Sequence, residues 1–175
     1  MNTNNTPLEM FYRWERETPE LTYTRQSLGG GQWIERTWRE VGQRARKIAS
    51  YLLEAKLPAQ SNIGIWSGNS SDWIEVDLAI MMAGHVSVPL FAGQEIEATR
   101  YIINHSGIEL LFCGATDFGA GHSIEGFSDL TVIACDGFEG QSVISIADIV
   151  SNYSALTESP IPDVDSLMTI VYSSG

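Results

Sequence analysis

Basic residues are scarce in this chain. Its 175 residues include ten lysines and arginines against 22 aspartates and glutamates, which gives a formal net charge of -12. A strongly anionic surface repels the phosphates of nucleic acids and of anionic lipid headgroups. The composition therefore argues against nucleic acid as a partner.

Cysteines are also few, since only Cys113 and Cys135 occur. Each ends an apolar run, and neither belongs to a Cys-x-x-Cys pair or stands near paired histidines. This pattern favours buried thiols over a disulfide or a metal site, and it fits a reducing cytoplasm. We predict no metal-binding residue in this chain.

The three histidines are scattered along the chain. His85 directly follows Gly84, and a histidine at such a corner is expected to cap a helix in a partly exposed position rather than to act as an acid or base. His105 and His122 are expected in solvated loops, without carboxylates at metal-ligand spacing.

Neither a secretory leader nor a membrane span is expected from the sequence. Its first residues, 1–7, are polar and uncharged, and no run of about 18 apolar residues occurs. Secretion and membrane spanning are therefore disfavoured, while peripheral attachment to a membrane stays open. With 43% hydrophobic residues, the chain is long enough for one α/β domain with its own core.

A glycine-rich turn separates two alternating segments near the N-terminus. Residues 21–25 and 33–37 alternate like strands, and Gly29, Gly30 and Gly31 lie between them. Three glycines also suggest a phosphate-binding loop. Because a strand rather than a helix follows them, we interpret the segment as the turn of a β-hairpin.

A capping box at Thr37 and Glu40 predicts the first helix, which should end before Pro58. Apolar residues recur there at steps of four, three and four, so they share one face of the helix: Val41, Ala45, Ile48 and Leu52. Arg44 and its basic neighbours fall mostly on other faces.

Strands and helices then alternate along the chain. The expected strands are 63–66, 86–90, 109–113, 130–135 and 167–172, and the expected helices are 72–83, 96–104, 118–127 and 146–153. This alternation predicts a doubly wound, mainly parallel sheet with helices on both faces, preceded by the small hairpin.

The corner between residues 66 and 73 allows two interpretations. Asn69 to Ser71 precede a helix that carries Asp72 and Glu75 in its first turn, so the corner amides could bind an anion or simply be capped. Trp66 and Trp73 flank the corner. They could line a ligand or partner surface, or pack in the core.

The last segment is the strongest indication of a binding site. Leu167 to Tyr172 form a nearly all-apolar run, which predicts a central strand covered on both faces. It leads into Ser173, Ser174 and Gly175. In parallel sheets ligands bind at the carboxyl ends of strands, so we predict that these three residues belong to a ligand-binding loop.

Three stretches resemble one known family, in the order that the family has them. The sequence RTWREV at 36–41 is similar to its early T-W-R-E-L segment, and AIMMAGHVSVPL at 79–90 resembles its second segment, in which a helix ends at glycine and a V-x-V-P-L strand follows. The sequence LMTIVYSSG at 167–175 resembles the strand that leads into the T-S-G-T-T-G-x-P-K-G loop. These are features of the adenylate-forming superfamily of AMP-binding, acyl-CoA synthetase and luciferase-like enzymes.

The sequence of 82–90 most resembles bacterial long-chain fatty-acid–CoA ligases. The resemblance implies a two-step reaction in which ATP activates a carboxylic acid as acyl-AMP and coenzyme A accepts the acyl group, with Mg²⁺ offsetting phosphate charge. It implies that Ser173, Ser174 and Gly175 bind the phosphates. Residues 1–175 would form the N-terminal part of the large domain, ending inside the phosphate loop and without the C-terminal domain or a catalytic residue.

Such a part would be inactive alone, and a homodimer is compatible with the family.

Two other functions stay open from the sequence. One is an adenylating enzyme that loads an amino or aryl acid onto a carrier thiol. The other is a non-catalytic, flavodoxin-like or receiver-like binding module.

Overall fold

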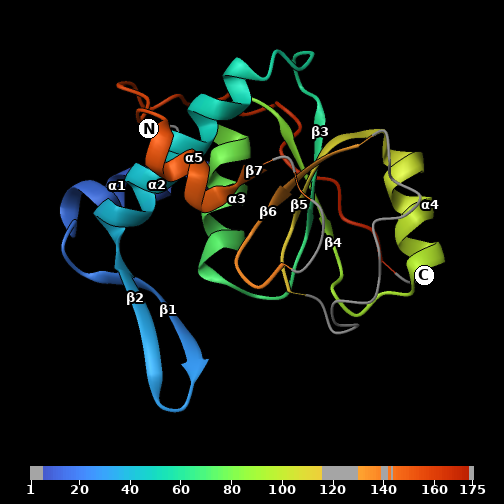
Figure 1. Cartoon of the computed structure of the whole chain (residues 1–175). Helices are drawn as coiled ribbons and strands as arrows, with labels where there is room; N and C mark the ends of the chain where they lie inside the picture. The colour runs from blue at the N-terminus through green and yellow to red at the C-terminus, as the bar shows by residue number, and fades with distance from the viewer. Residues whose placement is uncertain (1–5, 116–129, 139–141, 143, 174–175) are drawn as a thin grey trace.

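A five-stranded parallel sheet forms the centre of the computed structural model, which describes residues 6–115, 130–138, 142 and 144–173 (Figure 1). The strands lie in the order β4-β3-β5-β6-β7. Their bounds are β3 Asn62–Trp66, β4 Val86–Leu90, β5 Ile108–Cys113, β6 Thr131–Ala134 and β7 Ile144–Ser145. The predicted parallel sheet is confirmed.

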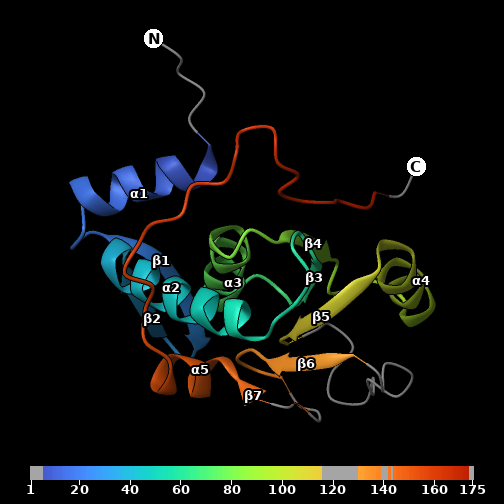
Figure 2. The same ribbon diagram turned by 90° about the horizontal axis from the view of Figure 1, so that it is seen from above.

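Helices cover both faces of this sheet (Figure 2). Their bounds are α1 Pro7–Glu17, α2 Trp38–Glu54, α3 Ser71–Met82, α4 Ile96–Ser106 and α5 Ile146–Asn152. One face packs against α1, α2, α3 and α5, and the other packs against α4. Because α3 and α4 lie on opposite faces, the chain winds first to one side of β3 and then to the other, as the alternation predicted.

A separate hairpin projects from the side of the molecule that carries α2 and α3, at the lower left of Figure 1. Its strands are β1 Thr22–Gly29 and β2 Gln32–Thr37, which pair antiparallel. Gly29, Gly30 and Gly31 have φ angles of +80°, +58° and +81°, a region that glycine adopts without a steric cost. The triple glycine is therefore a turn, as interpreted from the sequence.

The predicted capping box at the start of α2 is confirmed. The Thr37 hydroxyl accepts from the Glu40 amide at 3.2 Å, and the Glu40 carboxylate accepts from the Thr37 amide at 2.7 Å. Hydrogen bonds from the Thr37 amide and the Thr37 hydroxyl to the carboxylate lower the pKa of the Glu40 carboxyl. The apolar face of α2 is fully buried, so the helix starts and faces as its sequence predicts.

Helix α1 was not predicted, although the sequence carries a signal for it. Thr6 and Glu9 form a second capping box, and Pro7 occupies the first helical position. Leu8, Phe11 and Tyr12 are buried against the core. These three residues have the i, i+3, i+4 spacing of one helix face, so both the cap and the periodicity were available in the sequence.

Helices α1 and α2 approach closely at Gly42. A β-carbon there would lie 1.9 Å from Glu15 Oε1, which Arg46 Nη1 holds at 2.6 Å. Arg46 Nη2 binds the other carboxylate oxygen at 2.7 Å, so the pair is bidentate and mostly buried. The missing side chain at position 42 leaves the space that this ion pair occupies.

We therefore expect Gly42→Ala to lower the free energy of unfolding by about 1 to 2 kcal/mol, because the methyl group displaces the Glu15 carboxylate. In a Glu15→Ala background the same change should instead stabilise the chain by up to about 1 kcal/mol, since alanine favours helix over glycine. A double-mutant cycle from urea unfolding measures this reversal of sign. Equal effects in both backgrounds would contradict the explanation.

The expected central strand at 167–172 is wrong. Residues 168–170 pair with β4 through only two backbone hydrogen bonds, Ser87 N to Met168 O and Ile170 N to Ser87 O, both 2.9 Å. Met168 and Ile170 pack on the core, while Leu167 and Val171 are 56% and 68% exposed. An apolar run does not by itself reveal whether one or both of its faces are covered. The expected helix at 118–127 lies outside the described residues.

Candidate functional site

Segment 168–170 directs the chain toward the carboxyl edge of the sheet. It runs parallel to β4 with Thr169 level with Ser87, so the following residues advance toward the end of β4 at Leu90. Ser173 is exposed there. Of the three predicted binding residues it is the one that the structure describes, since Ser174 and Gly175 lie outside the described residues.

His105 lies close to this segment; it is exposed, as predicted, but it belongs to a helix rather than to the expected loop. His122 lies outside the described residues. His105 belongs to the last turn of α4, and its Nδ1 is 2.7 Å from the Tyr172 hydroxyl. The His105 ring also stacks on Tyr101, with centroids 5.3 Å apart and planes at 23°. The residue before Ser173 is thus bonded to a helix on the outer face of the sheet.

The corner after β3 is capped in the ordinary way. The Ser70 hydroxyl accepts from the Trp73 amide at 3.1 Å, and the Ser71 amide donates to Gln26 Oε1 of the hairpin at 2.8 Å. These bonds occupy two of the amides that an anion would need. Of the two interpretations from the sequence, the structure therefore favours capping.

The two tryptophans beside this corner have different surroundings. Trp66 is 3% exposed and packs in the core on the α4 side, where its indole nitrogen has no hydrogen-bond partner among the described residues. Trp73 is half-buried and lines a pocket of about 550 Å³ between the corner and β1. Only Trp73 therefore remains a candidate for contact with a ligand or partner.

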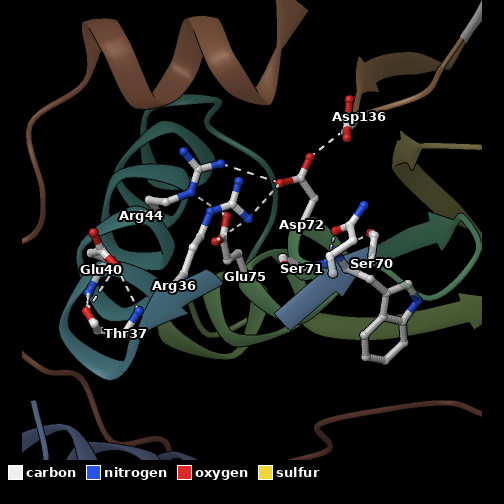
Figure 3. A network of polar contacts seen from close by, with 11 residues as sticks. Arg36, Thr37, Glu40, Arg44, Ser70, Ser71, Asp72, Glu75 and Asp136 are labelled. Carbon is white, nitrogen blue, oxygen red and sulfur yellow. Dashed lines mark hydrogen bonds and ion pairs between the residues drawn. The ribbon is translucent and has the colours of Figure 1, made fainter. Parts of the chain in front are cut away.

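Four charged side chains form a network near the carboxyl ends of β3 and β6, in which the two carboxylates are buried and the two guanidinium groups are partly exposed (Figure 3). Arg44 Nε donates to Glu75 Oε2 at 2.7 Å, and Arg36 Nη1 lies 3.1 Å from Glu75 Oε1 without hydrogen-bond alignment. Both guanidinium groups also approach Asp72 Oδ1, at 3.4 and 3.6 Å. The network joins β2, α2 and α3.

Asp72 extends the network to the sheet. Its Oδ2 accepts from the Asp136 amide, just after β6, at 2.9 Å. Glu75 is fully buried, and this burial raises the pKa of its carboxyl to about 7 although Arg44 and Arg36 oppose the shift. The arrangement fastens the first turn of α3 to the hairpin and to the end of β6.

The sequence analysis placed Asp72 and Glu75 in a favourable first turn and did not pair them. A usable signal exists, because α3 is apolar on nearly all sides and is therefore a buried helix. Acids in such a helix need cationic partners. The basic residues at 36 and 44 were available, although nothing local in the sequence selects them.

His85 corrects a second expectation. Its backbone amide donates to Ile80 O at 3.0 Å and the Gly84 amide to Met81 O at 3.1 Å, which is a Schellman cap. The side chain, however, is 6% exposed rather than partly exposed, and its Nδ1 has no partner among the described residues. Desolvation lowers the pKa of this imidazole.

The two cysteines are free and buried, as predicted. Burial raises the pKa of the Cys113 thiol to about 12 and raises that of Cys135 as well, so both are poor nucleophiles.

Within the described ranges, no group of three or more His, Cys, Asp or Glu side chains could hold a metal ion. No helix there is long and apolar enough to cross a membrane.

Comparison with known proteins supports one family. The model of the AMP-binding enzyme family matches residues 11–175. Fatty acyl-CoA synthetase A of Dictyostelium discoideum is 28% identical over 159 residues, which are 84% of this chain and 24% of that protein. Bacitracin synthase 3 of Bacillus licheniformis is 23% identical over 173 residues, which are 98% of this chain and 2% of that protein.

A solved structure has the same fold. The N-terminal subdomain of NpsA from Klebsiella oxytoca superposes with a TM-score of 0.70 at 16% identity, covering 98% of this chain and 39% of that one. The chain therefore spans about a quarter of the first curated relative and about two fifths of this structure.

Proposed function

This chain belongs to the family of AMP-binding enzymes, and from that premise we propose that the full-length protein is an ATP-dependent acyl-CoA synthetase for long-chain fatty acids. Fatty acyl-CoA synthetase A is among its relatives, which supports a fatty acid as the substrate, and the long-chain preference rests on the resemblance of residues 82–90. Residues 1–175 would form the N-terminal part of the large domain, with the remaining parts of the enzyme elsewhere in the protein.

The proposed reaction has two steps. A carboxylate oxygen of the fatty acid attacks the α-phosphorus of ATP, and pyrophosphate leaves as acyl-AMP forms. The thiolate of coenzyme A then attacks the acyl carbon, and AMP leaves. When bound, Mg²⁺ offsets the charge of the ATP phosphates. The described residues would position the nucleotide rather than exchange protons with it.

The position of Ser173 carries this proposal. An extended segment that pairs parallel with β4 leads to an exposed hydroxyl beyond the strand, at the edge where parallel sheets bind ligands. A small hydroxyl residue can donate to a phosphate oxygen without steric bulk, so Ser173 fits this role. We propose that Ser174 and Gly175 continue the same loop.

Acid-dependent exchange of pyrophosphate into ATP by the full-length protein tests the proposal. We expect exchange with long-chain fatty acids, and release of AMP only when coenzyme A is added. Assays without acid and with short-chain acids serve as controls. If no carboxylic acid in a panel of fatty, amino and aryl acids supports exchange, the proposal is wrong.

The similarity to bacitracin synthase 3 supports a second candidate, an enzyme that loads an amino or aryl acid onto a carrier thiol. The same assay separates the two. Exchange supported by an amino or aryl acid, without AMP release upon addition of coenzyme A, would favour the carrier-loading enzyme.

We also propose that the full-length protein is cytoplasmic and forms a homodimer. Cell fractionation would check the location, and sedimentation would check the oligomeric state.

A further inference from the structure

Few attachments hold the segment that runs from Met168, where the chain pairs with β4, to Ser173. Backbone hydrogen bonds to Ser87 hold Met168 and Ile170. Beyond Ile170, the contact between the Tyr172 hydroxyl and His105 Nδ1, at 2.7 Å, is the one hydrogen bond that the described residues make before and at Ser173. The position of Ser173 therefore depends on a side chain 67 residues before Tyr172 in the sequence.

The His105 ring is oriented from two sides. Tyr101, one helical turn earlier on α4, stacks on it at 5.3 Å. Tyr172 meets it edge-on, with centroids 5.8 Å apart and planes at 85°. Tyr172 also packs against the apolar cluster beneath α4, so its ring is half-buried. The imidazole therefore lies between two tyrosine rings, of which Tyr101 is exposed and Tyr172 is half-buried.

Capping of α4 does not require this arrangement. Gly107, in a left-handed conformation, donates to the Ile103 and Asn104 carbonyls, and the Ser106 hydroxyl donates to the Ile102 carbonyl at 2.6 Å. These bonds satisfy the end of the helix without the His105 side chain. Its imidazole nitrogen is directed to Tyr172 instead.

We propose that His105 is a positioning residue for nucleotide binding, which acts through Tyr172 on the loop that begins at Ser173. This inference rests on the proposed function, because it assigns the loop to the ATP phosphates. A loop held close to its binding geometry loses less freedom when the nucleotide binds. Removal of His105 or of the Tyr172 hydroxyl should therefore weaken ATP binding and leave the chemical step nearly unchanged.

Steady-state exchange kinetics of the full-length protein test the inference. A hydrogen bond typically contributes up to about a fivefold change in an equilibrium, so His105→Ala and Tyr172→Phe should each raise the KM for ATP by up to about fivefold, with kcat within about twofold. His105→Asn should restore most of the loss, since an amide group can replace Nδ1. Asn104→Ala, at an exposed neighbour on the same helix, is the matched control and should change neither constant.

The pair must also act as a unit. If the hydrogen bond is responsible, the double variant His105→Ala/Tyr172→Phe should have nearly the same KM as either single variant. An additive increase, or no rescue by asparagine, would indicate independent structural effects and overturn the inference.

Calorimetric titration of the wild type with ATP separates the two proposals. If ATP binds but no acid supports exchange, the proposed function fails and the ATP Kd of the variants still tests His105. If exchange is normal and the variants match the wild type, the positioning role is wrong and the proposed function stands. Without ATP binding, both are wrong.

Discussion

Replacement of Arg44 by methionine should lower the free energy of unfolding by about 3 kcal/mol at pH 8. The change keeps most of the apolar volume but removes the 2.7 Å hydrogen bond to Glu75, whose side chain is fully buried. Arg36 then remains as its one cationic partner in the described network. A buried carboxylate that loses its main counter-charge is strongly destabilising, unlike an exposed one.

Urea unfolding followed by tryptophan fluorescence would measure this loss. The matched control is Arg39→Met on the same helix, where the pair with Glu20 at 2.6 Å is exposed at both ends. That change should alter stability by less than about 1 kcal/mol. Equal losses for the two variants would show that burial of Glu75 does not decide the effect.

The loss should also depend on pH. Burial raises the pKa of the folded Glu75 carboxyl from its ordinary 4.5 to about 7, so the folded chain binds a proton that the unfolded chain has already released. The contribution of this group to stability is full below pH 4.5 and falls by about 3 kcal/mol as the pH rises through 7. The Arg44→Met penalty should therefore be smaller at pH 5.5 than at pH 8.

Glu75→Gln isolates this titration from that of the other carboxyl groups. The variant keeps the shape of the side chain and cannot ionise, so its stability should fall less steeply between pH 5 and 8 than that of the wild type. Parallel pH profiles of the two proteins would mean that Glu75 does not titrate in this range.

The arrangement of strands and helices was largely predictable. The strand Val86–Leu90 has the bounds that its sequence predicted, and most other elements agree within two residues. These elements depend on local signals such as capping residues, glycine at helix ends and apolar periodicity. Segment 167–172 differs because coverage of its faces depends on neighbours that a local pattern does not specify.

The candidate site was predictable only in part. The hydroxyl residue at 173 follows an apolar run, and that order is visible in the sequence. The pairing of Arg44 with Glu75 joins residues 31 apart, and that of His105 with Tyr172 joins residues 67 apart. Such pairs arise only when the sheet brings α2 to α3 and the last segment to α4.

A substitution in the middle of β3 should have a comparably large effect. Gly64 lies between β4 and β5, where a β-carbon would meet Leu111 Cδ1 at 2.6 Å and Ile108 Cδ1 at 3.0 Å. Glycine in a central strand thus leaves room for side chains of the neighbouring strand to cross it. Both of these side chains belong to the cluster that packs beneath α4.

We expect Gly64→Ala to lower the free energy of unfolding by about 1 to 2 kcal/mol and Gly64→Val by about 3 kcal/mol, because a well-packed core accepts added volume poorly. Gly68→Ala is the control, since its β-carbon would make only an ordinary contact at 3.4 Å, and it should be nearly neutral. Leu111→Ala should partly offset Gly64→Val by removing the side chain that it strikes. If the two losses simply add, crowding against Leu111 is not the cause, and strain in the β3 backbone would have to explain the effect.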